Sequence, residues 1–185
     1  MLSPRDRILS TAARLFQIQG YHATGLNQIV KESEAPKGSL YHYFPGGKEE
    51  LAVAALARSR RFITDRLENN LAKSDNAVQA FQGLVQSFAS ALDGSDFTAG
   101  LSVANLALDT AHSSEAIRQA CSEAYDEWIM LLREKLVADG HPADRASESA
   151  LLLHAWIEGA FIHAIVHRDT AIFRLIAQRI PVLLA

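Results

Sequence analysis

The sequence has little cysteine or proline and no long uninterrupted apolar run. A single cysteine, Cys121, among 185 residues excludes an intramolecular disulfide framework and any multi-cysteine metal site. Five prolines and ten glycines leave long stretches free of both, which favours helices over a loop-rich sandwich. The most apolar stretch, residues 150–166, is interrupted by His154, Glu158 and His163, so we expect no membrane span.

The first residues do not have the composition of a secretion signal. Arg5, Asp6, Arg7 and Arg14 lie where the apolar core of such a segment would be. The hydrophobic content of 49% is enough to build a folded core. Together with the single cysteine, these features predict a soluble, cytoplasmic protein with no membrane partner.

Catalytic and metal-binding signatures are also missing. The chain has no glycine-rich phosphate loop and no G-x-S-x-G elbow, and Cys121 has no fixed histidine partner. His163 and His167 are one helical turn apart, with His154 and Glu158 on neighbouring turns, but no HExxH pattern accompanies them. We therefore expect no metal, no cofactor and no enzymatic activity.

The charge differs between the two ends of the chain. Residues 1–66 contain ten Lys and Arg against six Asp and Glu, whereas residues 67–185 contain eight against fifteen. The net charge is −3, so only the N-terminal part is basic. This asymmetry suits an N-terminal module that binds an anion such as DNA.

Three short helices are expected at the N-terminus. Ser3 and Pro4 begin an amphipathic helix that Gly20 can end. A second helix over about 25–33 follows, with Thr24 as its cap, and Pro36 forces a break before a third helix over 37–43. This is the spacing of a helix-turn-helix.

A long helix over 48–71 leaves this small domain, and five further helices complete the chain. They are expected at about 75–93, 100–111, 114–138, 143–168 and 170–184. The predicted fold is all-α with about nine helices and no sheet. We assign residues 1–47 to a three-helix domain with helix-turn-helix spacing and 48–185 to a larger helical bundle.

The segment from Thr24 to Leu51, TGLNQIVKESEAPKGSLYHYFPGGKEEL, resembles the DNA-binding signature of the TetR family. The run KGSLYHYF over 37–44, followed by KEEL over 48–51, is more specific than a general helix-turn-helix pattern. The spelling PGGK over 45–48 and the run VANLA over 103–107 resemble the LmrA/YxaF branch. The resemblance implies a repressor that binds palindromic operator DNA as a homodimer and is released by a small apolar or aromatic effector. It implies DNA binding for residues 1–47, and effector binding and dimerisation for residues 48–185.

The DNA-binding residues carried over by this resemblance lie in the second and third helices and just after them. Phosphate contacts would come from Thr24, Tyr41 and Lys48, and base contacts from Lys37, Gly38 and His42, with Ser39 and Tyr43 beside them. Other readings remain open at this point. Thr24 could only cap a helix, Tyr41 and Tyr43 could be half-buried core, and Lys48 could be a solvated charge.

Effector and dimer residues are expected in the C-terminal bundle. Walls of an apolar pocket are predicted from Phe88, Leu92, Leu101, Asn105, Leu108, Trp128, His154, Trp156 and Phe161. Because residues 146–167 are apolar nearly all round, a dimer interface is predicted at Leu153, Ile157, Ala160, Phe161, Ala164 and Ile165. Asn105 and the histidines could instead form hydrogen bonds within the core.

Two other function classes stay open on the sequence alone. One is a helical small-molecule carrier or enzyme that retains a vestigial helix-turn-helix. The other is a DNA-binding regulator that responds to a protein partner.

Overall fold

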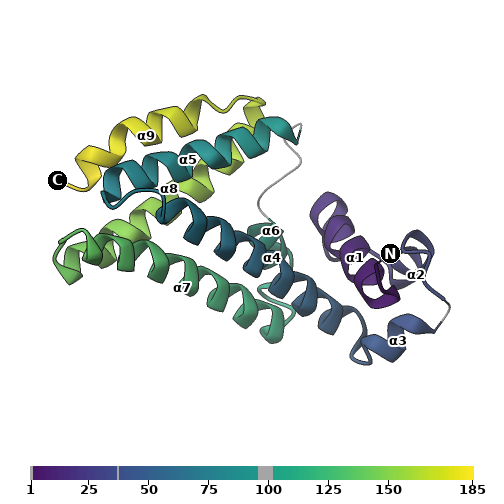
Figure 1. Cartoon of the computed structure of the whole chain (residues 1–185). Helices are drawn as coiled ribbons and strands as arrows, with labels where there is room; N and C mark the ends of the chain where they lie inside the picture. Colours follow the sequence, from purple (N-terminus) through teal and green to yellow (C-terminus); the bar gives the residue numbers. More distant parts are fainter. Residues whose placement is uncertain (1, 37, 96–101) are drawn as a thin grey trace. The chain divides into compact units, whose positions relative to one another are not determined.

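A computed structural model describes residues 2–36, 38–95 and 102–185 (Figure 1). These residues form nine α-helices and no strand, which confirms the predicted all-α fold. The helices are α1 (Pro4–Gln19), α2 (Leu26–Glu32), α3 (Ser39–Tyr43), α4 (Gly47–Leu71), α5 (Ala77–Gly94), α6 (Ser102–Thr110), α7 (Glu115–Ala138), α8 (Ala143–His167) and α9 (Ala171–Leu183).

The helices pack into two compact units that are not continuous stretches of chain. The first unit comprises Met1–Arg61 and Ser102–Ala124, and the second comprises Phe62–Leu101 and Tyr125–Ala185. Both α4 and α7 therefore contribute residues to each unit. Helix α6, expected to belong to the effector domain, packs with the N-terminal helices.

Helix α1 is the centre of the first unit. The side chain of Ser3 accepts the backbone N–H of Asp6 and so caps the helix, as expected. The apolar stripe is buried at Ile8, Ala12, Leu15 and Phe16, and α1 packs against α2, α3 and α6.

The cap of α2 differs from the prediction. Gly25 is the N-cap residue and makes no side-chain cap, so assigning Thr24 as the cap is wrong. The Thr24 hydroxyl donates to the Gly20 carbonyl at 2.7 Å instead, which draws the side chain back onto the preceding loop. Gly20 itself has a φ of +82°, which a residue with a side chain rarely adopts.

Helix α3 is shorter than the predicted 37–43 segment. Gly38, with a φ of +93°, is the N-cap, so regular helix begins only at Ser39. The predicted base contact Lys37 lies outside the described residues.

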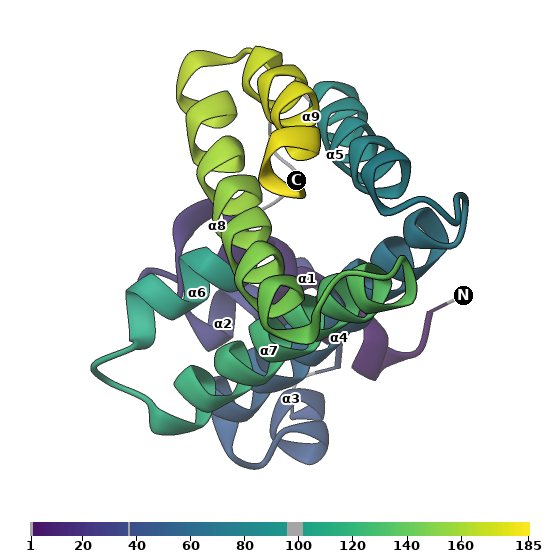
Figure 2. The same cartoon turned by 90° about the vertical axis from the view of Figure 1, so that its left-hand side faces the viewer.

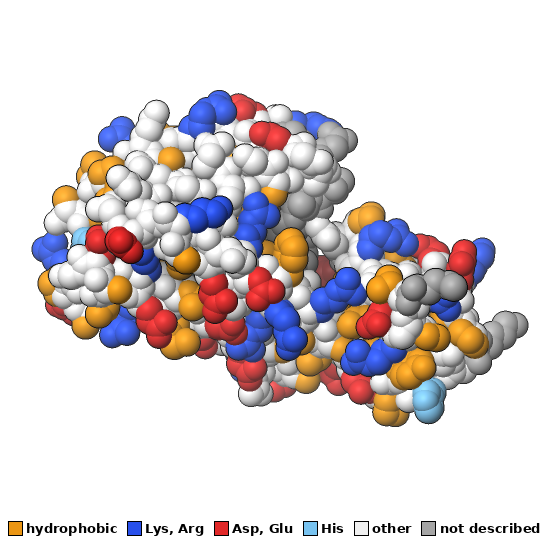
Figure 3. Space-filling model, viewed as in Figure 1, with side chains coloured by type: hydrophobic (Ala, Val, Ile, Leu, Met, Phe, Trp, Pro, Cys, Tyr) orange, Lys and Arg blue, Asp and Glu red, His pale blue; other side chains and the backbone are white. Residues whose placement is uncertain are grey.

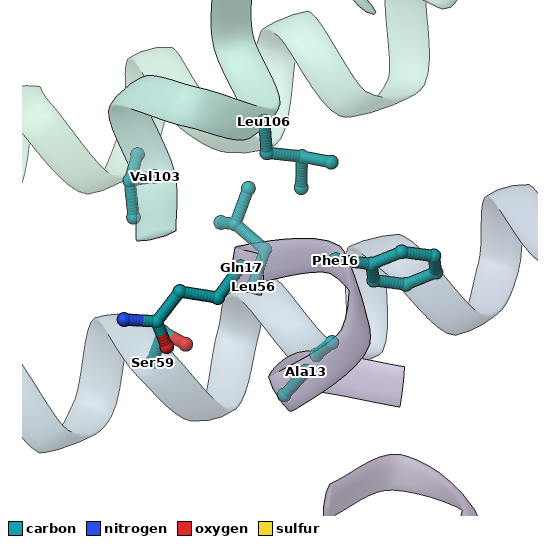
Figure 4. A pocket seen from close by; sticks show the side chains of 8 residues that line it. Ala13, Phe16, Gln17, Leu56, Ser59, Val103 and Leu106 are labelled. Atoms are coloured by element: carbon teal, nitrogen blue, oxygen red, sulfur yellow. The ribbon is translucent and has the colours of Figure 1, made fainter. Parts of the chain in front are cut away.

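Helix α6 faces α1 and α4 through two apolar side chains. Val103 and Leu106 point toward Phe16 of α1 and Leu56 of α4 around a small cavity (Figure 4). All four are buried. This packing attaches α6 to the N-terminal helices, which are far away in sequence.

In the second unit, α9 packs against both α5 and α8 (Figure 2). The core includes Phe81 and Leu84 of α5 and Phe173 and Ile180 of α9, all almost fully buried. Helix α8 is long and apolar enough to cross a membrane, and one third of its most apolar segment is buried inside the protein. Its buried face follows a helical period from Ala146 to Ala164.

Candidate functional site

Helix α3 exposes its polar side chains and buries its aliphatic one. Tyr41 is 62% exposed, and His42 is exposed beside it, while Leu40 and the following Phe44 are almost completely buried. The ring of Tyr43 meets that of His42 edge-on, with 4.9 Å between centroids. Because Leu40 and Phe44 anchor the helix, its exposed face has a fixed orientation within the unit.

The turn before α3 is held by an arginine that the sequence analysis did not select. The Nη2 atom of Arg7 on α1 donates to the carbonyl of Glu34, at 3.1 Å. Glu34 has a φ of +51°, which is uncommon for a residue other than glycine. Arg5, two residues earlier, has its guanidinium carbon 5.3 Å from the centre of the Phe44 ring. The only feature of the sequence that could have pointed to Arg7 is the pair of arginines in the first turn of α1.

A polar network joins α1 to α2. Arg14 pairs with Glu32 at 2.5 Å, and Gln28 donates to the other oxygen of the same carboxylate at 2.9 Å. Gln28 also forms hydrogen bonds with Gln19. The hydrogen bond from Gln28, followed by that from Arg14, lowers the pKa of Glu32. These contacts fix α2 on α1, and so the start of the turn into α3.

Lys48 lies in the first turn of α4 beside the α1–α2 loop. Its Nζ atom donates to the His22 carbonyl at 3.3 Å and lies 4.5 Å from the Tyr21 ring centre. Burial lowers the pKa of Lys48. An ammonium group has three N–H donors, so one contact to His22 leaves others for a phosphate.

The structure brings together most of the predicted DNA-binding residues. Gly38 is exposed and Ser39 is half-buried at the start of α3, next to exposed Tyr41 and His42. Thr24 is different because it is only 1% exposed, so its side chain does not lie on the surface. Lys and Arg side chains, a histidine and apolar side chains are interspersed over the α1–α3 region (Figure 3).

The second unit contains polar side chains in an aromatic core. Trp128 on α7 is buried, and its indole N–H donates to the Thr64 hydroxyl of α4 at 3.1 Å. Thr64 in turn donates to Glu127 at 2.7 Å. The rings of Tyr125 and His154 meet edge-on, with 4.7 Å between their centroids. The ring centroids of Trp128 and His154 are 6.3 Å apart.

His154 is the incompletely satisfied member of this cluster. Its Nε2 atom is buried and has no hydrogen-bond partner among the described residues. Burial lowers the pKa of His154, which favours the neutral ring. Burial also raises the pKa of Glu158 one turn later, partly offset by a hydrogen bond from Tyr125. The cluster therefore places polar groups against the aromatic rings of Tyr125 and Trp128.

The predicted effector residues are divided between the two units. Phe88 and Leu92 are buried on α5, and Phe161 meets Phe88 at 5.4 Å between ring centroids. Trp156 is half-buried. Asn105 and Leu108 lie on α6 in the first unit, and Leu101 is outside the described residues. Leu108 is 79% exposed, so its prediction as a pocket wall is wrong.

Comparison with known proteins decides the family. Residues 8–55 match the family described as "Bacterial regulatory proteins, tetR family". Residues 77–179 match "Transcriptional regulator LmrA/YxaF-like, C-terminal domain". The chain belongs to the LmrA/YxaF-like group of TetR family regulators. It is therefore a DNA-binding transcriptional regulator, as the sequence motif predicted.

Two Bacillus subtilis relatives of this TetR family regulator align along almost its whole length. The regulator YxaF is 42% identical over 97% of the chain and 94% of its own length. The regulator LmrA is 39% identical over 97% of the chain and 96% of its own length.

Solved structures agree on the fold. The reduced form of Escherichia coli NemR superposes with a TM-score of 0.87 at 25% identity, covering 99% of this chain and 98% of NemR. A TetR regulator from Legionella pneumophila gives 0.85 at 20% identity, covering 98% and 97%. The latter shows a likeness of fold alone.

Most of the predicted dimer residues of this regulator are buried on α8. Leu153, Ile157, Ala160 and Ala164 are buried in the protomer's own core, so their side chains are not exposed on the protomer surface. Phe161 and Ile165 are half-buried. The exposed large apolar side chains of α8 and α9 are Leu151, Leu152, Ile162, Val166, Leu175 and Val182.

Proposed function

We propose that this regulator is a repressor that binds palindromic operator DNA as a homodimer and is released by a small apolar or aromatic effector. The observation that carries the proposal is the exposed polar face of α3, with Lys48 at the start of the next helix. Relatives supply the coarser part, because they are transcriptional regulators. The proposed location is the cytoplasm, where operator DNA is found.

The DNA-binding face divides by chemistry. Tyr41 and Lys48 would hold phosphates, which fixes orientation without reading sequence. His42, Ser39 and the small Gly38 would approach the base edges, with the half-buried Tyr43 supporting His42. Thr24 is left out of the contact set because its hydroxyl is buried on Gly20.

The exposed apolar residues of α8 and α9 are proposed to form the dimer interface. Ile162 is 51% exposed and Val166 is 70% exposed, one turn apart on α8. Side chains of this size in water cost free energy that a second copy would recover by covering them. An isologous interface of this kind also explains why α8 is apolar on more than its core face.

The effector is proposed to bind in the second unit around His154. A polar group of the effector would form a hydrogen bond with the unpartnered Nε2 atom of His154, while its apolar part contacts Trp128 and Phe161. We retain the functional division of residues 1–47 for DNA and 48–185 for effector and dimer. The packing units differ from this division because α6 packs on α1.

Selection from a random pool of DNA duplexes tests this proposal. The full chain should enrich a palindrome whose half-sites are about one duplex turn, roughly 34 to 36 Å, or a multiple of it apart. His42→Ala should enrich a less defined sequence from the same pool. Failure of the full chain to enrich any sequence would contradict sequence-specific DNA binding.

A further inference from the structure

The loop between α6 and α7 contacts both elements that surround Lys48. This corner, residues 109–114, ends α6 and leads into α7. It reaches the α1–α2 loop through Asp109 and the first turn of α4 through Ser114. All of these residues belong to the first compact unit.

Asp109 grips two consecutive residues of the α1–α2 loop. Its carboxylate accepts the backbone N–H of Tyr21 at 2.8 Å. Its carbonyl accepts a hydrogen bond from Nε2 of His22 at 2.7 Å. A Cβ atom on Gly20 would lie 2.6 Å from the same carboxylate, so only glycine permits this approach.

The gripped residues are the ones that hold Lys48. The Lys48 Nζ donates to the His22 carbonyl, and the Tyr21 ring lies beneath it at 4.5 Å. The Ser114 hydroxyl also donates to the carboxylate of Glu49, the residue after Lys48, at 2.5 Å. Three hydrogen bonds from one corner thus hold the residues around the ammonium group.

We propose that the α6–α7 corner positions Lys48 for its contact with the DNA backbone, with Asp109 as the positioning residue. The proposal rests on the proposed DNA-binding function. It adds that operator affinity depends on a residue that does not touch DNA.

The sign of the Asp109→Ala effect separates this role from simple electrostatics. Removing a negative charge from a DNA-binding unit should strengthen binding to an anion through the long-range field. If instead Asp109 positions Lys48, loss of its carboxylate should weaken DNA binding, by about tenfold for one charged hydrogen bond. We call the contacts of Asp109 with Tyr21 and His22 the clamp. Asp109→Asn keeps an acceptor oxygen for the Tyr21 N–H, so it should restore affinity.

A double-mutant cycle on the full chain tests the link to Lys48. DNA affinity is measured over a range of salt concentrations for wild type, Asp109→Ala, Lys48→Ala and the double variant, on the selected palindrome and an unrelated duplex of equal length. Asp109→Ala should weaken binding to both duplexes. It should also lower the slope of log affinity against log salt concentration by about 0.9, as the loss of one phosphate contact does. In the Lys48→Ala background, Asp109→Ala should cause no further loss of affinity. A general loss of structure would not reproduce this pattern.

His22→Ala provides a second variant if Asp109→Ala folds poorly. His22 is exposed, and the substitution removes its ring contact with Asp109 while leaving the carbonyl that holds Lys48. It should weaken binding in the same direction, and only when Lys48 is present. Unchanged or stronger binding by Asp109→Ala and His22→Ala, or additive effects with Lys48→Ala, would overturn the clamp while the DNA-binding function stands. Unchanged affinity of Lys48→Ala would instead refute the phosphate contact, and the clamp with it.

Discussion

Arg7 on α1 donates a hydrogen bond to the carbonyl of Glu34, which connects the first helix to the turn before α3. Glu34 in this turn has a left-handed backbone conformation, which is unfavourable for a residue other than glycine. The hydrogen bond to its carbonyl helps to hold the turn in that conformation. The Nε atom of the same guanidinium group is buried and has no hydrogen-bond partner among the described residues. Arg7 thus contributes one made bond and one desolvation cost.

Arg7→Met should lower the free energy of unfolding by about 1 kcal/mol, because the stem still packs while the bond to Glu34 is lost. Urea denaturation measures the change. DNA affinity should fall on specific and unrelated duplexes, since the turn that orients α3 loosens. A more stable variant would mean that the cost of burying Nε exceeds the value of the bond.

His42→Ala should change which DNA sequences are bound more than how tightly DNA is bound overall. The ring is exposed on α3 and is supported by Tyr43, as expected of a side chain that reads base edges. Losing one base contact should cost about 1 to 3 kcal/mol at one position of each half-site. Competition between the selected palindrome and single-base variants measures this. Equal losses on every sequence would assign His42 to the backbone instead.

Replacement of His154 should change how stability depends on pH. Burial lowers the pKa of this histidine below its ordinary value of about 6.5, so the unfolded chain takes up the proton first. Its contribution to stability is therefore complete above that value and is lost as the pH falls below it. Wild type should lose stability relative to His154→Phe between neutral and mildly acidic pH.

Unfolding midpoints of both proteins at a series of pH values measure this difference. Glu158 acts in the opposite direction, because burial raises the pKa of its carboxyl and favours the protonated, folded form as the pH falls. Comparing two proteins that share Glu158 removes its contribution. A constant difference across the range would show that His154 has the same pKa in both states.

Val166→Glu should weaken self-association by about tenfold or more, since it places a charge in the proposed α8–α9 interface. Leu108→Glu is the matched control, because Leu108 is also exposed but lies on α6. Sedimentation at several concentrations measures the dimer fraction. If the two substitutions weaken the dimer equally, the interface is not on α8.

The helices were predictable because local chemistry specifies them. Ser3 before Pro4 caps α1 as predicted, and Pro36 lies in the turn between α2 and α3, whereas Gly38, expected inside the third helix, is its left-handed N-cap. The misplaced cap of α2, Thr24 for Gly25, reflects two adjacent residues of types that are both common at N-caps. Propensity alone does not choose between them.

Burial faces and distant contacts were less predictable. Helix α8 is apolar nearly all round, so sequence periodicity could not tell the core face of Leu153 from the exposed face of Leu152. The packing of α6 on α1, and with it the grip of Asp109 on Tyr21, depends on contacts between residues almost ninety positions apart. Such non-local pairings leave no local pattern, which is why Asp109 and Arg7 were missed.

The salt dependence of DNA binding by Lys48→Ala tests the central claim most directly. Lys73→Ala is the control, because it removes the same charge from a lysine that is bonded to Asn70 beyond the end of α4. The account predicts that Lys48→Ala weakens binding to all duplexes and reduces the salt slope by about 0.9, while Lys73→Ala leaves the slope unchanged. Equal slopes for wild type and Lys48→Ala would contradict the assignment of this surface to DNA.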